Sequence, residues 1–204
     1  MGSNPQTAIH PGTPSDISWA EGNWIFLDVG FSHSSRSSGV LFGEETPRCL
    51  QFGEATREIL DRLRGARSLT NLVVEAPLSV CFDSRGNPKG RSLERHGSKT
   101  RYWYNGLGCA VMVAAMYLVR EIHQAGCAAR LFEGFVSYKD GSVPSSHMND
   151  VLMLREIVRD PAKFSENIYS AERLKLDPSD KLESAFAVAE IDCGIPAVIA
   201  RCLP

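Results

Sequence analysis

The stretch that decides the fold is Trp24-Ile25-Phe26-Leu27-Asp28-Val29-Gly30, an apolar run interrupted by one carboxylate. Aromatic and branched residues in so short a run predict a buried strand. The pattern recurs in Leu72-Val73-Val74-Glu75-Ala76. Strands disfavour such acids, because a buried carboxylate without a partner costs free energy. Each acid alone is equally consistent with a strand end that meets water. Together they predict a ligand site, since open α/β sheets bind ligands at the carboxyl ends of their strands.

The rest of the chain predicts a mixed sheet covered by helices. Short connections to apolar segments at 39–42 and 48–52 predict an antiparallel meander with the first strand. Apolar periodicity and turn residues then predict helices over 54–64, 105–124, 150–159 and 179–192, and strands over 71–77, 129–136 and 197–200. A meander followed by alternating strands and helices is typical of an α/β fold, here five strands with helices on both faces.

Length and composition favour one domain. The chain has 204 residues, 43% of them hydrophobic and 23% charged, which excludes a wholly disordered or coiled-coil protein. We expect a flexible leader over residues 1–22 and a single domain over 23–204. That domain contains a basic loop at 79–104 and an insert with an extra helix at 137–178.

The cysteines and the apolar segments bear on location. None of the six cysteines forms a C-x-x-C pair, and no secretory signal is evident, so we expect a cytoplasmic protein. The longest apolar stretch, 106–119, is shorter than the roughly 20 residues that a membrane span needs. A buried helix and no membrane partner are therefore expected.

Further carboxylates are candidates to complete the site. Asp180 and Glu183 are three residues apart, which places both on one face of the helix predicted there. Asp180 is also explained as a first-turn residue favoured by the helix dipole. Asp150, close to His147, is a second placement for the helix carboxylate. Glu133, alone in an apolar strand, is a further candidate with an equally good interpretation as an edge or capping residue.

A local excess of positive charge contrasts with the formal net charge of -2. Between residues 85 and 101, six basic residues face one acid, a balance of +5, and Tyr102-Trp103-Tyr104 follows directly. The basic residues are Arg85, Lys89, Arg91, Arg95, Lys99 and Arg101. Cations next to aromatic rings favour contacts with phosphates and bases of nucleic acid. A solvated surface loop that anchors the next helix is the alternative.

The order of elements, with Asp on the first strand, resembles the RNase H-like superfamily. Three patterns resemble its RuvC-like branch and a group of uncharacterised predicted RNase H-like nucleases: 27–32 (Leu-Asp-Val-Gly-Phe-Ser), 74–79 (Val-Glu-Ala-Pro-Leu-Ser) and 180–186 (Asp-Lys-Leu-Glu-Ser-Ala-Phe). The resemblance spans residues 24–200. It implies an RNase H-like fold with metal ligands at Asp28, Glu75, Asp180 and Glu183, although the family more often has Asp at the last position.

These observations lead to a first hypothesis of a nuclease that hydrolyses phosphodiester bonds with two Mg²⁺ or Mn²⁺ ions. Carboxylate oxygens suit such ions, and a pair of them activates water and stabilises the leaving oxygen. The alternative is a catalytically weak or inactive scaffold that binds nucleic acid or a protein. An actin-like nucleotide-binding domain is less favoured, and no P-loop or dinucleotide-binding motif is present. DNA versus RNA, a homodimer and the choice between Glu183 and Asp150 stay open.

Overall fold

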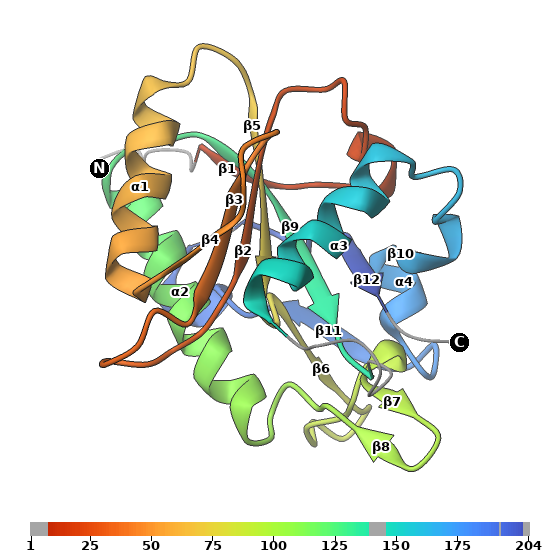
Figure 1. Ribbon diagram of the computed structural model, residues 1–204. Coiled ribbons are helices and arrows are strands. Elements are labelled where there is room, and N and C mark those ends of the chain that lie inside the picture. Colours follow the sequence, from red (N-terminus) through yellow and green to blue (C-terminus); the bar gives the residue numbers. More distant parts are fainter. Residues whose placement is uncertain (1–7, 139–145, 192, 202–204) are drawn as a thin grey trace, which may run out of the picture.

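A mixed, eight-stranded sheet forms the centre of the computed structural model, which describes residues 8–138, 146–191 and 193–201 (Figure 1). Strand β2 (Asn23–Asp28) lies in its middle, next to antiparallel β3 (Ser38–Phe42), which pairs with antiparallel β4 (Arg48–Leu50). On the other side, β5 (Thr70–Glu75) and β9 (Ala129–Val136) run parallel to β2. The predicted meander and the parallel strands that follow it are confirmed.

The sheet has more strands than the five predicted. Strand β12 (Val198–Arg201) confirms the strand predicted over 197–200 and runs parallel to the second half of β9. Strand β10 (Ile168–Tyr169), which was not predicted, pairs with β12. Strand β1 (Ile9–Pro11) pairs with the first half of β9. Two- and three-residue edge strands have too few residues for a period-2 pattern, so the sequence gives little sign of them.

Residues 8–22 differ from the flexible leader expected there. Besides β1, they contain a 3₁₀ turn, Pro14–Asp16, and the buried side chains of Ile9 and Ile17. The backbone N–H of Gly12 donates to the carbonyl of Leu131, which ties this segment to β9. Residues 1–7 of the predicted leader lie outside the described part of the chain.

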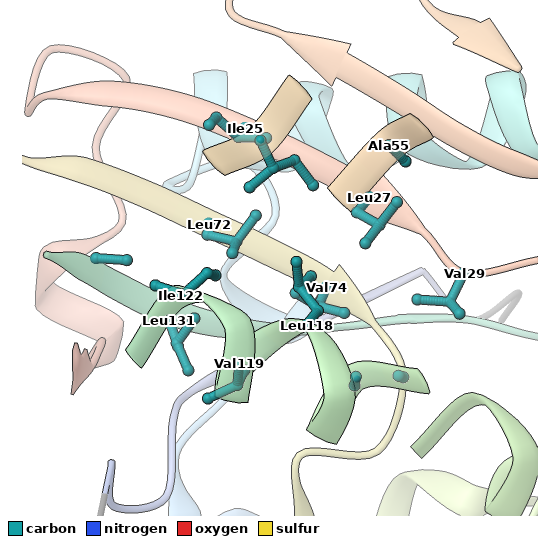
Figure 2. Close-up of a cluster of buried hydrophobic side chains, with 14 of the residues drawn as sticks. Ile25, Leu27, Val29, Ala55, Leu72, Val74, Leu118, Val119, Ile122 and Leu131 are labelled. Atoms are coloured by element: carbon teal, nitrogen blue, oxygen red, sulfur yellow. The ribbon is translucent and has the colours of Figure 1, made fainter. Parts of the chain in front are cut away.

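Helices cover both faces of the sheet. Helices α1 (Phe52–Gly65) and α2 (Leu107–Gln124) pack on one face, and α3 (His147–Arg159) packs on the other. Figure 2 shows the first contact, where Ile25, Leu27, Leu72 and Val74 of the sheet meet Leu118 and Ile122 of α2. The three helices confirm the helices predicted over 54–64, 105–124 and 150–159, with shifts of up to three residues at their ends.

The alternation of side chains along β2 divides the core in two. Ile25 and Leu27 belong to the cluster under α1 and α2, whereas Trp24 and Phe26 belong to the cluster under α3. Helix α3 lies within the segment 137–178 that was expected to be an insert, yet it covers a whole face of the sheet. Helix α3 therefore forms part of the core.

The helix predicted over 179–192 is wrong. Residues Lys181–Ser184 form strand β11, which pairs with β6 (Ser79–Phe82), and a 3₁₀ turn follows at Ala187–Ala189. The Asp180 carboxylate accepts the backbone N–H groups of Leu176 and Asp177, N-terminal to it. A helix cap would instead accept N–H groups that follow it. The same residue types therefore close a turn here, after the short helix α4 (Ala171–Leu174).

The predicted basic loop, 79–104, has structure of its own. It contains β6, a 3₁₀ turn at Ser92–Glu94 and a small hairpin of β7 (Arg95–His96) and β8 (Lys99–Thr100). A 3₁₀ turn at Ser165–Asn167 completes the elements of the described residues. Among the helices of these ranges, none has the length and apolar character needed to cross a membrane.

Candidate active site

One register row crosses four strands of the sheet and contains both strand carboxylates. Asp28 pairs with Gly39 of β3 on one side and with Glu75 of β5 on the other, and Glu75 pairs with Gly134 of β9. Asp28 and Glu75 end their strands, on the face that Phe26 and Val73 present to α3. The pattern of one acid at the end of each apolar strand therefore predicted two residues that are neighbours.

Helix α3 crosses this row. A Cβ at Gly39 would lie 2.3 Å from the carbonyl oxygen of His147, so the first turn of α3 packs directly on β3. A Cβ at Gly134 would lie 2.9 Å from Cδ1 of Leu154, so the next turns reach β9. Seven residues of helix rise about 10 Å, comparable to the roughly 14 Å between strands three positions apart. Asp150 lies between these two anchors, on the buried side of α3.

His147 reaches the first of the strand carboxylates. Its Nδ1 lies 2.9 Å from Oδ2 of Asp28, whose residue is only 3% exposed, while the His147 side chain is 42% exposed. Ser146 holds the start of the helix, because its hydroxyl accepts the backbone N–H of Asn149. The imidazole thus covers Asp28 from the solvent side. The sequence offered His147 and Asp150 only as additional candidates, because the small residues Ser184 and Ala185 favoured close packing of a helix that carried Asp180 and Glu183.

Glu75 is held from the neighbouring strand. Its Oε1 accepts the backbone N–H of Val136 at 3.2 Å, and the residue is half-buried. Gly134 of β9 pairs with Glu75, and a Cβ at Gly134 would lie 3.2 Å from the Cα of Glu75. The absence of a side chain at Gly134 therefore lets β9 lie close to the end of β5. The carboxylate is therefore oriented by backbone that belongs to a different element.

Glu133 lies away from the two strand acids, on the opposite face. Leu131, two residues earlier on the same strand, belongs to the cluster under α1 and α2, and Glu133 shares its side. The Glu133 carboxylate accepts the backbone N–H of Leu78 and a hydrogen bond from Arg91, both at 2.8 Å. It closes the turn between β5 and β6, so the interpretation as a capping residue is the one that its contacts favour.

Arg91 is a buried structural residue. Its guanidinium donates to Glu94 and Glu133 and to the hydroxyl of Ser79, and all four side chains are buried. Burial opposes the charge of Arg91, but the two carboxylates outweigh it and raise the pKa of the guanidinium. Burial raises the pKa of Glu94 despite the neighbouring Arg91. With its donors occupied in the core, Arg91 is not available for the phosphate contact that the sequence predicted.

Lys89 and Asp180 also pair with each other. Nζ of Lys89 lies 2.6 Å from Oδ1 of Asp180, whose side chain is buried. Burial raises the pKa of Asp180, but the hydrogen bonds from Lys89, Asp177 and Leu176 outweigh it and lower the pKa overall. Because Lys181 pairs with Phe82 at the end of β6, Asp180 lies at the end of the β6–β11 pair that is away from Glu75.

Glu183 is on β11, opposite Val80, and is exposed. The helix that would have presented it with Asp180 is absent from the described residues. Residues 180–186 therefore form a strand and a turn. The helix that crosses the register row is α3, and its buried carboxylate is that of Asp150.

Four of the six predicted phosphate-binding cations remain exposed: Arg85, Arg95, Lys99 and Arg101. Three of them lie in or next to the β7–β8 hairpin. The hydroxyl of Tyr138, just after β9, donates to the carbonyl of Glu94, and its ring lies 5.5 Å from that of His96. The hairpin is therefore anchored near the edge of the sheet at which Glu75 ends.

Two tyrosines follow the hairpin. The rings of Tyr102 and Tyr104 stack with centroids 5.2 Å apart, and Trp103 is buried below them. The indole N–H of Trp103 donates to the carbonyl of Lys89, and this hydrogen bond fixes the segment. Tyr104 is exposed and presents an aromatic surface beside the hairpin cations.

The donors in and over the row suit a hard divalent cation, since Asp28 and Glu75 of the strands and Asp150 of α3 offer carboxylate oxygens. In the described ranges, however, no three His, Cys, Asp or Glu side chains are grouped closely enough to hold a metal ion. The residue types therefore fit such an ion by their chemistry, although their side chains do not surround one point in the part of the chain that the structure describes. Comparisons with family models, with curated proteins and with solved structures found no match.

Proposed function

We propose that the protein is a divalent-metal-dependent nuclease with an RNase H-like fold, whose metal ligands are Asp28, Glu75 and Asp150. The observation that carries the proposal is the register row, in which two strand carboxylates are neighbours under the helix that bears the third. The meander, the two parallel strands and the helices on both faces are the arrangement expected of that fold. Asp150 takes the place of Asp180 and Glu183, which lie next to and within β11 of a separate two-stranded sheet.

The residues of the chain would act as follows. A bound Mg²⁺ or Mn²⁺ pair would activate water and stabilise the leaving oxygen. Asp28 and Glu75 offer their oxygens from the ends of two rigid strands, and His147 orients the Asp28 carboxylate. The exposed cations of the β7–β8 hairpin would hold the phosphates of the substrate, and Tyr104 would stack against a base.

Cleavage assays test this assignment. Labelled single- and double-stranded DNA and RNA are incubated with Mg²⁺ or Mn²⁺ and the purified protein. We expect Asp28→Asn, Glu75→Gln and Asp150→Asn to abolish cleavage while leaving the circular dichroism spectrum unchanged. Glu183→Gln separates the two ligand sets, because it retains activity if Asp150 is the third ligand. Full activity of Asp28→Asn, purified away from contaminating nuclease, would contradict the proposal.

A second candidate is a scaffold that binds nucleic acid or a protein without turnover. The observation that favours it is the lack of a closed ligand set in the described residues, together with the contact of His147 on Asp28. It predicts salt-dependent binding of nucleic acid and no cleavage with either ion. Titration with Mn²⁺, followed by calorimetry on wild type and Asp28→Asn, distinguishes the two, since only the nuclease should lose a metal site.

A further inference from the structure

Three exposed cations of the β7–β8 hairpin form no ion pair with any residue that the structure describes. Arg95 and Arg101 donate hydrogen bonds to backbone carbonyls, and Lys99 extends from the second strand of the hairpin. Elsewhere on the surface, Arg48 and Arg62 both pair with carboxylates. Three cations within the seven residues 95–101 that lack such partners create a local positive potential, which attracts an anionic ligand.

Glu94, at the base of the hairpin, fixes where these cations lie. Its carbonyl accepts the backbone N–H of Arg101 and the hydroxyl of Tyr138, and its buried carboxylate accepts the backbone N–H of Trp103. The guanidinium of Arg91 balances the charge of that carboxylate. The hairpin and the aromatic segment that follows it are therefore held by one buried residue.

The same residue connects the hairpin to the edge of the sheet where Glu75 ends. Val136 donates its backbone N–H to Glu75, and Tyr138, which binds Glu94, follows Val136 by two residues. Two residues of chain extend over at most about 7 Å. Figure 1 shows the hairpin beyond the tip of β9. A ligand on the hairpin therefore lies close to the carboxylate of Glu75.

Tyr104 adds an aromatic ring next to the cations. It stacks on Tyr102 with the two ring planes 18° apart, and it is 36% exposed. Tyr102 lies against Gly90, where a Cβ would come within 2.3 Å of the Tyr102 ring. The absence of a side chain at Gly90 therefore leaves room for the stacked pair, and Tyr104 presents part of its ring to a planar ligand.

A ring beside a small cationic hairpin favours an unpaired nucleic acid strand over a duplex. Neighbouring base pairs cover the base faces inside a duplex, so a side-chain ring stacks on bases that are unpaired. The strands of the hairpin have two residues each and are about 7 Å long. They are too short to reach both rows of phosphates that border a major groove about 12 Å wide. One row of phosphates with accessible bases is what a single strand offers.

We propose that the substrate is single-stranded nucleic acid, with its phosphates on Arg95, Lys99 and Arg101 and one base on the ring of Tyr104. This inference rests on the proposed nuclease function and names the substrate class of the same site. Glu94 is a positioning residue, because it contacts the hairpin and not the strand. Single-stranded DNA and single-stranded RNA both carry the phosphates and bases that these residues recognise, so the test has an arm for each.

Fluorescence anisotropy in EDTA measures binding without metal-dependent cleavage. Labelled single strands of DNA and of RNA are compared with the duplexes of the same sequence at one salt concentration. We expect the preferred single strand to bind at least about tenfold more tightly than either duplex. Tyr104→Ala should weaken single-strand binding by about 5- to 150-fold, the contribution of one stacked base, and should leave duplex binding unchanged.

Two variants control for the loss in Tyr104→Ala. Tyr104→Phe keeps the ring and should bind as wild type does. Tyr117→Ala removes a tyrosine that is 44% exposed on α2, about 15 Å along the helix from its first residue, and should also bind normally. A duplex bound as tightly as the single strand, or equal losses in Tyr104→Ala and Tyr117→Ala, would overturn the proposal.

An abasic strand tests whether Tyr104 acts on a base. Such a strand keeps its phosphates and lacks its bases, so wild type should bind it more weakly than the complete strand. Tyr104→Ala should lose less affinity than wild type when the bases are removed, because it has no ring for them to stack on. Equal losses in the two proteins would show that the ring does not contact a base, and would contradict the proposal.

Cleavage with Mn²⁺ distinguishes a failure of this inference from a failure of the proposed function. Cleavage of a duplex at the same rate as a single strand would support the nuclease and overturn the single-strand substrate. Tyr104-dependent binding of a single strand, with no cleavage by either ion, would contradict the nuclease and support the hairpin and Tyr104 as a single-strand site.

Discussion

Gly39 lies directly under the backbone of His147, so close that a Cβ at position 39 would come within 2.3 Å of the His147 carbonyl oxygen. Gly39→Ala must therefore push the first turn of α3 away from the sheet. Adding a methyl group to a well-packed contact lowers the free energy of unfolding by about 1–3 kcal/mol. The contact here is with backbone, which cannot change rotamer to make room. We expect urea unfolding to show a loss of stability of at least this size.

Gly53→Ala is the control for Gly39→Ala. Gly53 lies in α1, and a Cβ there would meet nothing within 4 Å. Because Ala favours a helix over Gly by up to about 1 kcal/mol, this variant should be neutral or more stable. Equal effects of the two substitutions would contradict the close contact between β3 and α3.

Arg91 tests the difference between a structural and a substrate-binding cation. Arg91→Met leaves Glu94 and Glu133 buried without their common partner, which typically costs about 3–5 kcal/mol. Arg95→Gln, at an exposed position of the hairpin, should change stability by less than about 0.5 kcal/mol. Thermal and urea unfolding of both variants measure this. A stable Arg91→Met protein would show that the network does not hold the turn after β5.

The Lys89–Asp180 pair predicts acid sensitivity. The hydrogen bonds to Asp180 hold its folded-state pKa below the ordinary value of 3.8. Its stabilising effect is therefore complete above pH 3.8 and is lost as the pH falls through the folded-state pKa. Unfolding by urea at neutral pH and at several acidic pH values should show that the deficit of Asp180→Asn shrinks toward zero in acid.

A double-mutant cycle provides the control for the acid effect. In a Lys89→Met background, Asp180 has lost its charged partner, so Asp180→Asn should cost less than in the wild type. Additive effects of the two substitutions at neutral pH would mean that the pair contributes nothing beyond the separate residues.

Nucleic-acid binding through the hairpin predicts a change in salt dependence. Each phosphate contact contributes about 0.7–0.9 to the slope of log K against log salt. Replacing Arg95, Lys99 and Arg101 by Gln should lower that slope by about 2–3 if each cation contacts one phosphate. Fluorescence anisotropy with a labelled oligonucleotide at several salt concentrations gives the slope.

Three exposed arginines elsewhere control for net charge. A variant with Gln in place of Arg57, Arg64 and Arg67, in or next to α1, has the same change in charge. It should leave the slope nearly unchanged. An equal loss in both triple variants would mean that binding follows overall charge and not the hairpin.

The sequence predicted the elements whose signals are local. The apolar runs around Asp28 and Glu75 and the periodicity of α1 and α2 correspond to the observed strands and helices. Their central positions in the sheet follow from the same runs, because strands apolar on both sides must be covered on both sides. The adjacency of Asp28 and Glu75 could therefore be predicted from the sequence.

The wrong predictions concern residues whose structural role depends on partners that are distant in the sequence. The segment that ends at Asp180 has residue types typical of a helix start. Lys89, which is distant in sequence, donates a hydrogen bond to the Asp180 carboxylate instead. Arg91 is one of six basic residues between positions 85 and 101, and only the positions of Glu94 and Glu133 reveal that it is buried. Ile9 is part of the core through an edge strand of three residues, too short for a pattern.

The position of Asp28 in the register row depends on the correct pairing of β2 with its neighbouring strands. Side chains alternate along a strand, so a slip of β2 by one residue would turn Asp28 toward α1 and α2 and place Leu27 under α3. Such a protein would keep most of its backbone hydrogen bonds and its helix content, and far-ultraviolet spectra would hardly change. The chemistry of this edge therefore reports on the fidelity of strand pairing more sensitively than any measure of secondary structure.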